Sequence, residues 1–454
     1  MTWKRRISAG AMLALAASAA GASAQRGGPR LDGPPFDGPR LDGFVWPDRA
    51  GVAGAVRRMP PSFGAAVAVE GRVALIGAPS AVRGGRRSGA VHVAVRTARG
   101  GDWLAPPGSD LDPGPVGAGA RFGAALDLEA PPSAGEGIAA AGAPSAHGPG
   151  GALSGLVRVF AVDVRTGRSR WLTDLAPPRG SEGAAFGSSV AVGTAPGGAT
   201  RIAVGAPRAR AHAGGMRSGA VLVFERSAGA PPAAWCHVHT LAPPSGGIAD
   251  DFGASVCFAG PGVVVGAPGT GGHAPGAGTA YVFDRRGRLR WRLAAPASDP
   301  NRSAGARYGT RVCALGPSRI AVAAFGRAAV EVVDLRPGGP SHRALLRGDP
   351  IGGFGLALAG DADEVWVGAP FAGPDGAGAV HRFVRVGTGY SDVGALRPEP
   401  PTADGEFGLA LDLVRRPDGS VAALVGEPRS DQPCPVEAPR CASGRVVVYG
   451  TDAP

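Results

Sequence analysis

Short runs of alternating apolar residues, separated by glycine and proline, recur along most of this 454-residue chain. In the stretch 186–226, a Phe-Gly pair opens one run that ends at Val192, and a second run ends at Gly205-Ala206-Pro207. A polar, glycine-rich loop follows, and then a third run, 218–224. Short runs of β-branched residues bounded by Gly or Pro are typical of β-strands. The pattern therefore predicts three successive strands in each unit.

The same order of parts occurs seven times, at a spacing of 46 to 66 residues. The other units begin at Phe63-Gly64, Phe122-Gly123, Phe252-Gly253, Tyr308-Gly309, Phe354-Gly355 and Phe407-Gly408. Their second runs end at Gly77-Ala78-Pro79, Gly142-Ala143-Pro144, Gly266-Ala267-Pro268, Gly368-Ala369-Pro370 and the variant Gly426-Glu427-Pro428, whereas the fifth unit has Ala323-Ala324-Phe325. A repeat of this length indicates a propeller or a solenoid.

These paired signatures resemble the FG-GAP repeats of the integrin α-subunit N-terminal β-propeller, over roughly residues 51 to 450. The resemblance implies a single all-β domain, a seven-bladed β-propeller of four-stranded antiparallel blades. Blades crowd near the axis, so inner strands need small residues, and larger side chains are needed farther out. Four tryptophans are placed accordingly, in the expected outer strands: Trp103, Trp171, Trp235 and Trp291. The last unit lacks such a strand, and we expect residues 52–59 to supply it and close the ring.

The amino-terminal end has the features of an export signal. Residues 1–24 combine a basic start, an apolar stretch and the small residues Ala22-Ser23-Ala24 at the cleavage site. Residues 25–50 are rich in Pro and Gly and are interpreted as an extended linker, followed by the propeller over 51–454. No later segment reaches membrane-spanning length. We therefore expect an exported monomer in the periplasm or outside the cell, and the Ala, Arg and Gly bias favours a Gram-negative bacterium.

The chain is basic, but its charge pattern argues against nucleic acid. The formal net charge of +11 falls to +8 when the signal, with Lys4, Arg5 and Arg6, is removed. The remaining basic residues are arginines scattered over every unit, whereas nucleic-acid-binding proteins concentrate charge on one face. Because Lys4 is the only lysine, a Walker-type phosphate loop and Schiff-base chemistry are also excluded.

We expect no cofactor. In propellers of this family, a calcium loop often joins strands one and two, but only Asp361-Ala362-Asp363-Glu364 and Asp412 with Asp418 offer carboxylates there, too few for calcium. A disulfide between Cys434 and Cys441 is favoured because they flank a short loop. The other three cysteines, Cys236, Cys257 and Cys313, are expected to be buried and free. Cys257 and Cys313 share one register in neighbouring units, so their side chains should point the same way round the ring rather than at each other.

Three local motifs have both a functional and a structural interpretation. His147, His212 and His273 lie in equivalent loops of consecutive units and could converge on a metal or an anion, or be solvated. Residues 161–171 resemble a tryptophan-docking segment of quinoprotein dehydrogenases, but also read as a tight turn. Arg347-Gly348-Asp349 is an adhesion tripeptide by type, but in a chain rich in Gly and Arg chance is the dominant explanation.

Antiparallel connectivity places the loops between strands two and three on the same face as those that lead into the next unit. The former are long in six units, and short at Phe325-Gly326-Arg327 in the fifth. Rigid scaffolds carry function on such loops, and we expect this face to bind a protein or glycan without catalysis. The candidate binding residues are Arg86, Arg87, His147, Arg208, Arg210, His212 and His273. The alternative is a propeller enzyme, either a quinone-dependent dehydrogenase or a hydrolase of glycans or lipids.

Overall fold

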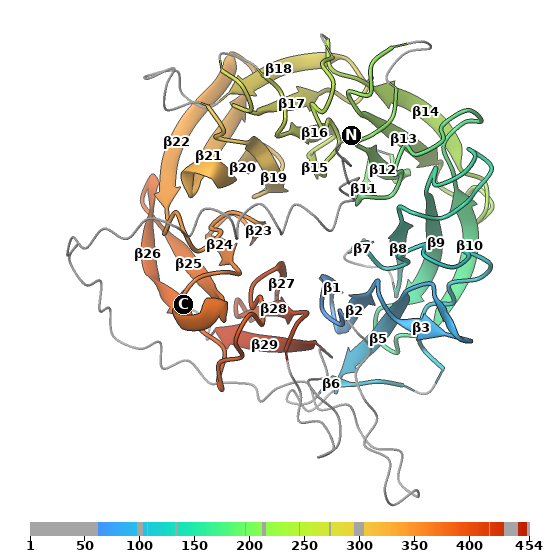
Figure 1. Ribbon diagram of the computed structural model, residues 1–454, viewed down its shortest axis with the longest axis horizontal. Coiled ribbons are helices and arrows are strands. Elements are labelled where there is room, and N and C mark those ends of the chain that lie inside the picture. Colours follow the sequence, from blue (N-terminus) through green and yellow to red (C-terminus); the bar gives the residue numbers. More distant parts are fainter. Residues whose placement is uncertain are drawn as a thin grey trace, which may run out of the picture. The chain divides into compact units, whose positions relative to one another are not determined.

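The computed structural model describes residues 62–97, 103–106, 108–131, 135–195, 197–210, 215–244, 246–271, 274–294, 304–416, 418–430 and 444–451. The predicted signal peptide and linker lie outside these residues. Seven antiparallel sheets follow one another around a ring (Figure 1). The fold is thus the predicted seven-bladed β-propeller.

Each blade runs outward in chain order, so that its first strand lines the axis. The strands, blade by blade, are β1 (Ala66–Glu70), β2 (Val73–Ala78), β5 (Ala90–Arg96) and β6 (Trp103–Leu104); β7 (Ala125–Glu129), β8 (Glu136–Ala143), β9 (Leu156–Asp163) and β10 (Ser169–Leu175); β11 (Ser189–Thr194), β12 (Thr200–Ala206), β13 (Ala220–Arg226) and β14 (Cys236–Leu241); β15 (Ser255–Ala259), β16 (Gly262–Ala267), β17 (Thr279–Phe283) and β18 (Leu289–Ala294); β19 (Tyr308–Ala314), β20 (Arg319–Ala324), β21 (Ala329–Arg336) and β22 (Gly339–Arg347); β23 (Ala357–Gly360), β24 (Glu364–Ala369), β25 (Ala379–Val386) and β26 (Gly389–Leu396); and β27 (Ala410–Arg415), β28 (Val421–Glu427) and β29 (Arg445–Thr451).

The two sequence signatures meet within each blade and between blades. In blade 1, the amide of Gly64 donates to the carbonyl of Gly77 at 2.9 Å. The Cα of Gly77 also lies against the carbonyl oxygen of Gly123 in blade 2, where a Cβ would come well under 3.0 Å from that oxygen. The same pairing occurs at every blade that keeps both glycines, so the glycines are required because two backbones approach closely.

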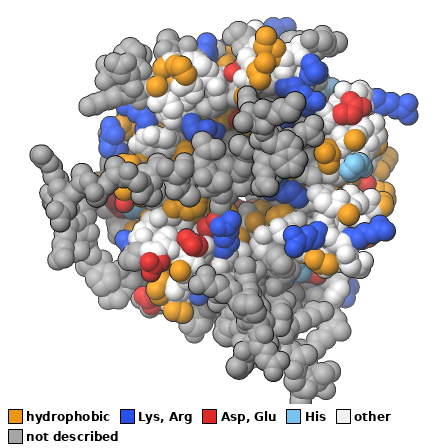
Figure 2. All heavy atoms as spheres, viewed as in Figure 1, with side chains coloured by type: hydrophobic (Ala, Val, Ile, Leu, Met, Phe, Trp, Pro, Cys, Tyr) orange, Lys and Arg blue, Asp and Glu red, His pale blue; other side chains and the backbone are white. Residues whose placement is uncertain are grey.

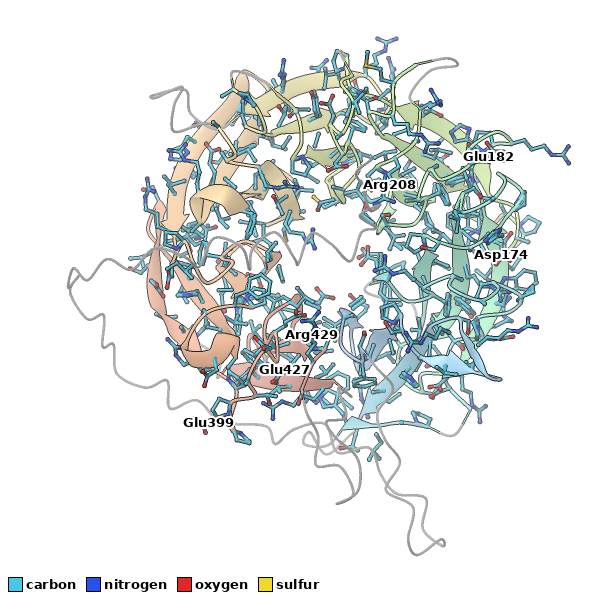
Figure 3. The ribbon with its side chains drawn as sticks, in the orientation of Figure 1. Asp174, Glu182, Arg208, Glu399, Glu427 and Arg429 are labelled. Atoms are coloured by element: carbon cyan, nitrogen blue, oxygen red, sulfur yellow. The ribbon has the colours of Figure 1, made fainter. Side chains whose placement is uncertain are left out.

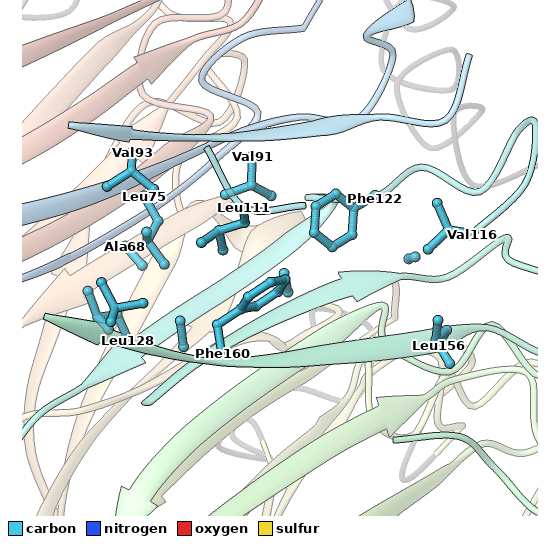
Figure 4. Packing of buried hydrophobic residues seen from close by; sticks show 14 of the residues in the cluster. Ala68, Leu75, Val91, Val93, Leu111, Val116, Phe122, Leu128, Leu156 and Phe160 are labelled. Carbon is cyan, nitrogen blue, oxygen red and sulfur yellow. The ribbon is translucent and has the colours of Figure 1, made fainter. Parts of the chain in front are cut away.

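The core is divided among the blade interfaces. All seven aromatic residues of the Phe-Gly and Tyr-Gly pairs are at most 1% exposed. Seven clusters of buried apolar side chains fill the seven interfaces, and Figure 4 shows the one between blades 1 and 2, where Phe122 and Phe160 pack against Leu75, Val91 and Leu111. The small residues of the inner strands permit this crowding, as predicted.

Blade 7 packs directly on blade 1. Phe63, Ile76, Leu424 and Val446 share one apolar cluster, and Gly426 lies against the carbonyl of Gly64. In its described residues, blade 7 has three strands. The predicted fourth strand, 52–59, lies outside the described residues and stays a prediction.

The outer strands and the loops agree with the sequence analysis. Trp103, Trp171 and Trp291 lie in β6, β10 and β18, and Trp235 directly precedes β14. The short connection in blade 5 is a single 3₁₀ turn, η3 (Phe325–Arg327), and a second, η4 (Pro374–Gly376), lies in the corresponding loop of blade 6. The described residues include no helix of the length and hydropathy that a membrane span requires.

Candidate functional site

The candidate arginines lie exposed on the face that carries the loops between strands two and three. Arg86 and Arg87 form β4 (Arg86–Arg87), which pairs with β3 (Val82–Arg83) in a small hairpin of blade 1. Arg208 and Arg210 follow β12 in blade 3. Figure 2, which views this face, shows arginine and apolar side chains interspersed around the ring.

Only one of the three candidate histidines can be placed. His147 is exposed in the loop of blade 2. His212 and His273 lie outside the described residues, so their convergence stays untested. The site on this face is therefore built from arginines, His147 and the apolar side chains beside them.

Arg217 ties the loops of blades 2 to 4 together. Its guanidinium donates to the carbonyl oxygens of Glu182 at 3.0 Å, Gly183 at 3.2 Å and Arg208 at 3.2 Å. Its own carbonyl accepts from the amide of Ala249 at 3.3 Å. Figure 3 places Glu182 and Arg208 on this same side of the ring. The side chain of Arg217 thus joins its own loop to that of Glu182 and Gly183, and its backbone carbonyl joins both to the loop of Ala249.

Blade 7 carries a buried acid at the place where most other units have alanine. Glu427 is fully buried, and Arg445 donates to its carboxylate. Burial raises the pKa of Glu427, although Arg445 opposes this shift. Nearby, Arg429 pairs with the buried Glu406 at 3.1 Å, and Figure 3 shows Glu427 and Arg429 side by side over this blade. These acids have their own cations, so this part of the face is internally neutralised.

A cavity of about 460 Å³ lies on the axis of the propeller, and the innermost strands of all seven blades line it. On each of these strands, the residue five positions after the aromatic residue of the Phe-Gly or Tyr-Gly pair occupies an equivalent place. In blade order these residues are Ala68, Asp127, Ala191, Cys257, Cys313, Ala359 and Asp412. The acids at this position, Asp412 and Asp127, belong to blades 7 and 2 on either side of blade 1, whereas the other five blades carry Ala or Cys.

The acids of this wall connect neighbouring blades. The carboxylate of Asp127 accepts from the amide of Val192 in blade 3 at 2.6 Å, and that of Asp412 accepts from the amide of Val69 in blade 1 at 2.7 Å. Burial raises the pKa of Asp127 to about 6 and that of Asp412 to about 8, against these hydrogen bonds. Burial and the charge of Asp127 raise the pKa of Glu70 to about 7.

The other carboxylates considered for calcium are bound by arginines or by Ser420 instead. Both oxygens of Asp361 accept from Arg415, at 2.8 and 3.0 Å, and Glu364 forms a bidentate pair with Arg382 at 2.8 and 2.9 Å. Asp418 accepts from the backbone and hydroxyl of Ser420. Within the described ranges, no group of three or more His, Cys, Asp or Glu side chains is arranged to hold a metal ion.

The described cysteines are free thiols. Cys257 packs into the interface of blades 4 and 5 and Cys313 into that of blades 5 and 6, so the two side chains point the same way round the ring, as predicted. Burial raises the pKa of both thiols, that of Cys313 to about 12. Cys236 was expected to be buried, and this is wrong: it is exposed, because it begins β14, whose outer edge faces solvent. Cys434 and Cys441 lie outside the described residues.

Two motifs have a structural explanation. In residues 161–171, the carboxylate of Asp163 accepts from the amides of Arg165 and Thr166 at 2.9 Å each, which closes the turn between β9 and β10. In the tripeptide 347–349, a Cβ on Gly348 would collide with the ring of Phe354. Packing against this ring therefore requires glycine at that position.

Sequence analysis missed Asp127 and considered Asp412 only as a carboxylate for calcium, not as a residue of the axial wall. A single strand does not reveal which of its two faces meets the axis. The signal that could have found Asp127 and Asp412 is the alignment of the units, since they interrupt a position otherwise held by Ala or Cys.

A comparison with known protein families agrees with the repeat seen in this architecture. A family model described as FG-GAP repeat matches residues 235–283, which span the outer strand of blade 3 and three strands of blade 4. No curated protein matches the chain. A solved structure titled "Streptogramin B lyase structure" is similar with a TM-score of 0.49 and 9% identity, over 88% of this chain and 96% of that one. With its repeated Phe-Gly and Gly-Ala-Pro contacts and its seven blades, this chain fits an FG-GAP repeat protein that resembles the integrin α-subunit propeller.

Proposed function

We propose that this chain is an exported, non-catalytic binding module that recognises a macromolecular partner through its loop-rich face, in an adhesive or structural role. The observation that carries the proposal is the set of exposed arginines on loops held by backbone hydrogen bonds. Arg86, Arg87, Arg208 and Arg210 are exposed, and the described parts of their loops contain no carboxylate. Arginine is enriched at interface hot spots because it combines a planar donor fork with an apolar stem.

The test is capture of partners from the envelope and medium of the native organism. The loop-face variant carries Ala at Arg208 and Arg210. The matched control carries Ala at Arg285 and Arg286, two exposed arginines in the turn between β17 and β18, on the opposite face. We expect the loop-face variant to lose partners that the wild type and the control retain. Equal capture by all three proteins would contradict the proposal.

The acidic axial wall favours one alternative, a hydrolase that uses carboxylates. Acids with raised pKa values can donate protons near neutral pH. However, Asp127 and Asp412 each bind a backbone amide of the next blade, which gives them a structural role. Turnover of glycoside or ester substrates by the pure protein, abolished in Asp127→Asn without loss of folding, would favour the enzyme over the binding module.

A further inference from the structure

Three aliphatic side chains are exposed on the loops that Arg217 ties together. Leu153 is 50% exposed, Met216 58% and Ile248 75%. Leu153 belongs to the loop of blade 2 whose Ala152 carbonyl accepts from Gly183 at 3.0 Å, and Arg217 binds the carbonyl of that same Gly183. Ile248 precedes Ala249, which donates to the carbonyl of Arg217. We call Leu153, Met216 and Ile248 the aliphatic strip.

Leu153 is held in a conformation that its side chain disfavours. Its φ is +51°, and the amide of Ser154 donates to the carbonyl of Gly151, so that Leu153 is the third residue of a turn. At the same place in blades 4 and 6 stand Gly276 and Gly376, each with φ +64°. Among the described non-glycine residues with positive φ, Leu153 alone has a large apolar side chain. Strain combined with exposure of an apolar side chain points to a binding role.

The loop of Ile248 is likewise held open toward solvent. The carboxylate of Asp250 accepts from the amide of Gly247 at 2.6 Å and so closes a tight turn around Ile248. On the next blade, Gly269 packs against the carbonyl of Ala249 and donates to that of Asp250. The aliphatic strip is thus presented by rigid loops, which lowers the entropic cost of binding.

The surroundings indicate the chemistry of the partner. The exposed charged residues on these loops are four arginines and one acid: Arg179, Arg208, Arg210, Arg217 and Glu182. The loop of Ile248 also contains Asp250, which is buried and bound to the amide of Gly247, and the half-buried Asp251, so the charge that faces solvent is mainly positive. The large exposed apolar side chains described on this face are all aliphatic, whereas the exposed Trp171 lies on the outer strand β10. An aromatic ring, with its apolar face and polar tip, is the usual platform for a sugar, and the strip offers none.

Resting on the proposed binding function, we infer that the aliphatic strip, flanked by arginines, docks an acidic segment of a partner protein that contributes aliphatic side chains.

The opposite face offers a matched control residue. Val386, at the turn between β25 and β26, is 63% exposed. A photoreactive benzoylphenylalanine replaces either Met216 or Val386 in the full chain, and protein from the native envelope and medium is cross-linked and sequenced.

We expect the probe at position 216, and not that at 386, to label a protein segment richer in Asp and Glu than in Lys and Arg. Leu153→Asn and Ile248→Asn should each weaken binding of that protein about tenfold or more, whereas Val386→Asn should not. Leu153→Asn should leave the Tm unchanged or raise it, because Asn tolerates positive φ. A packing role for Leu153 predicts a lower Tm instead.

The outcomes separate this inference from the function on which it rests. If wild type captures a partner that the Arg208 and Arg210 variant loses, but the label at 216 is a polysaccharide, a basic segment or absent, the binding function stands and the acidic-segment inference falls. Undiminished binding by both Asn variants also overturns the inference. If wild type captures no partner, the binding function and the inference fall together.

Discussion

Gly77→Ala tests whether the close contact between signatures holds the blades together. A Cβ at this position points at the carbonyl oxygen of Gly123 in the next blade, at a separation well under 3.0 Å. Backbone cannot turn aside as a flexible side chain can, so blades 1 and 2 must separate locally by about 1 Å, and overpacking of this kind costs about 1–3 kcal/mol. Alanine also lowers the conformational entropy of the unfolded chain, which offsets this loss of stability by about 0.4–1 kcal/mol. The net loss therefore lies within about 0–2.6 kcal/mol and is centred near 1 kcal/mol, a fall of about 1–2 °C in Tm for a domain of this size.

The assay is thermal unfolding followed by circular dichroism and by calorimetry. Gly338→Ala is the matched control, because Gly338 lies in the turn between β21 and β22 with no atom near its Cβ position and without a positive φ. We expect this control to match or slightly exceed the wild type in Tm. If Gly77→Ala unfolds at the same temperature as the control, the steric explanation of the repeat signature is refuted.

Three further predictions concern buried charged and polar groups. Tyr308→Phe should destabilise the fold by about 1–3 kcal/mol, because the Tyr308 hydroxyl donates to buried Glu331 at 2.5 Å; adding Glu331→Leu should restore most of the loss in urea unfolding. Asp174→Ala should cost about 2 kcal/mol or more and exceed Arg158→Met in calorimetry, since it strands the buried guanidinium that it binds at 2.9 Å. The pKa of Glu70 is raised to about 7 in the folded protein, so its contribution to stability is complete below its ordinary pKa of 4.5 and is lost as the pH rises through about 7. Glu70→Gln should therefore flatten the fall in Tm between pH 4.5 and about 7. An unchanged slope of Tm against pH would contradict this prediction.

The fold was predictable because the repeat records contacts that sequence must satisfy at every blade. Gly77 and Gly123 have to be glycine wherever two backbones touch, and the aromatic residue before Gly123 has to fill an interface. The aromatic requirement recurs in seven blades and the glycine pair in six, and this repetition separates them from chance. The position of the loop arginines on one face followed from strand connectivity alone.

The candidate site was less predictable because its determinants occur once. The sequence of a single loop does not indicate that Leu153 has a positive φ, or that the guanidinium of Arg217 binds the carbonyl of Gly183 in a different loop. The burial of Asp127 likewise depends on which face of its strand meets the axis. Cys236 was misjudged for the same reason, since the outer strand presents one edge to solvent.

Departures from the repeat differ in whether the chain itself compensates them. Tyr308 replaces phenylalanine, and its hydroxyl donates a hydrogen bond to Glu331. Glu427 replaces alanine, and its carboxylate accepts a hydrogen bond from Arg445. Each substitution therefore finds its counterpart inside the propeller. Leu153 replaces a residue that blades 4 and 6 supply as glycine, and half of its surface stays exposed to solvent while its backbone is strained. We therefore expect the interaction that offsets the strain and the exposure of Leu153 to come from the partner that we infer docks on the aliphatic strip.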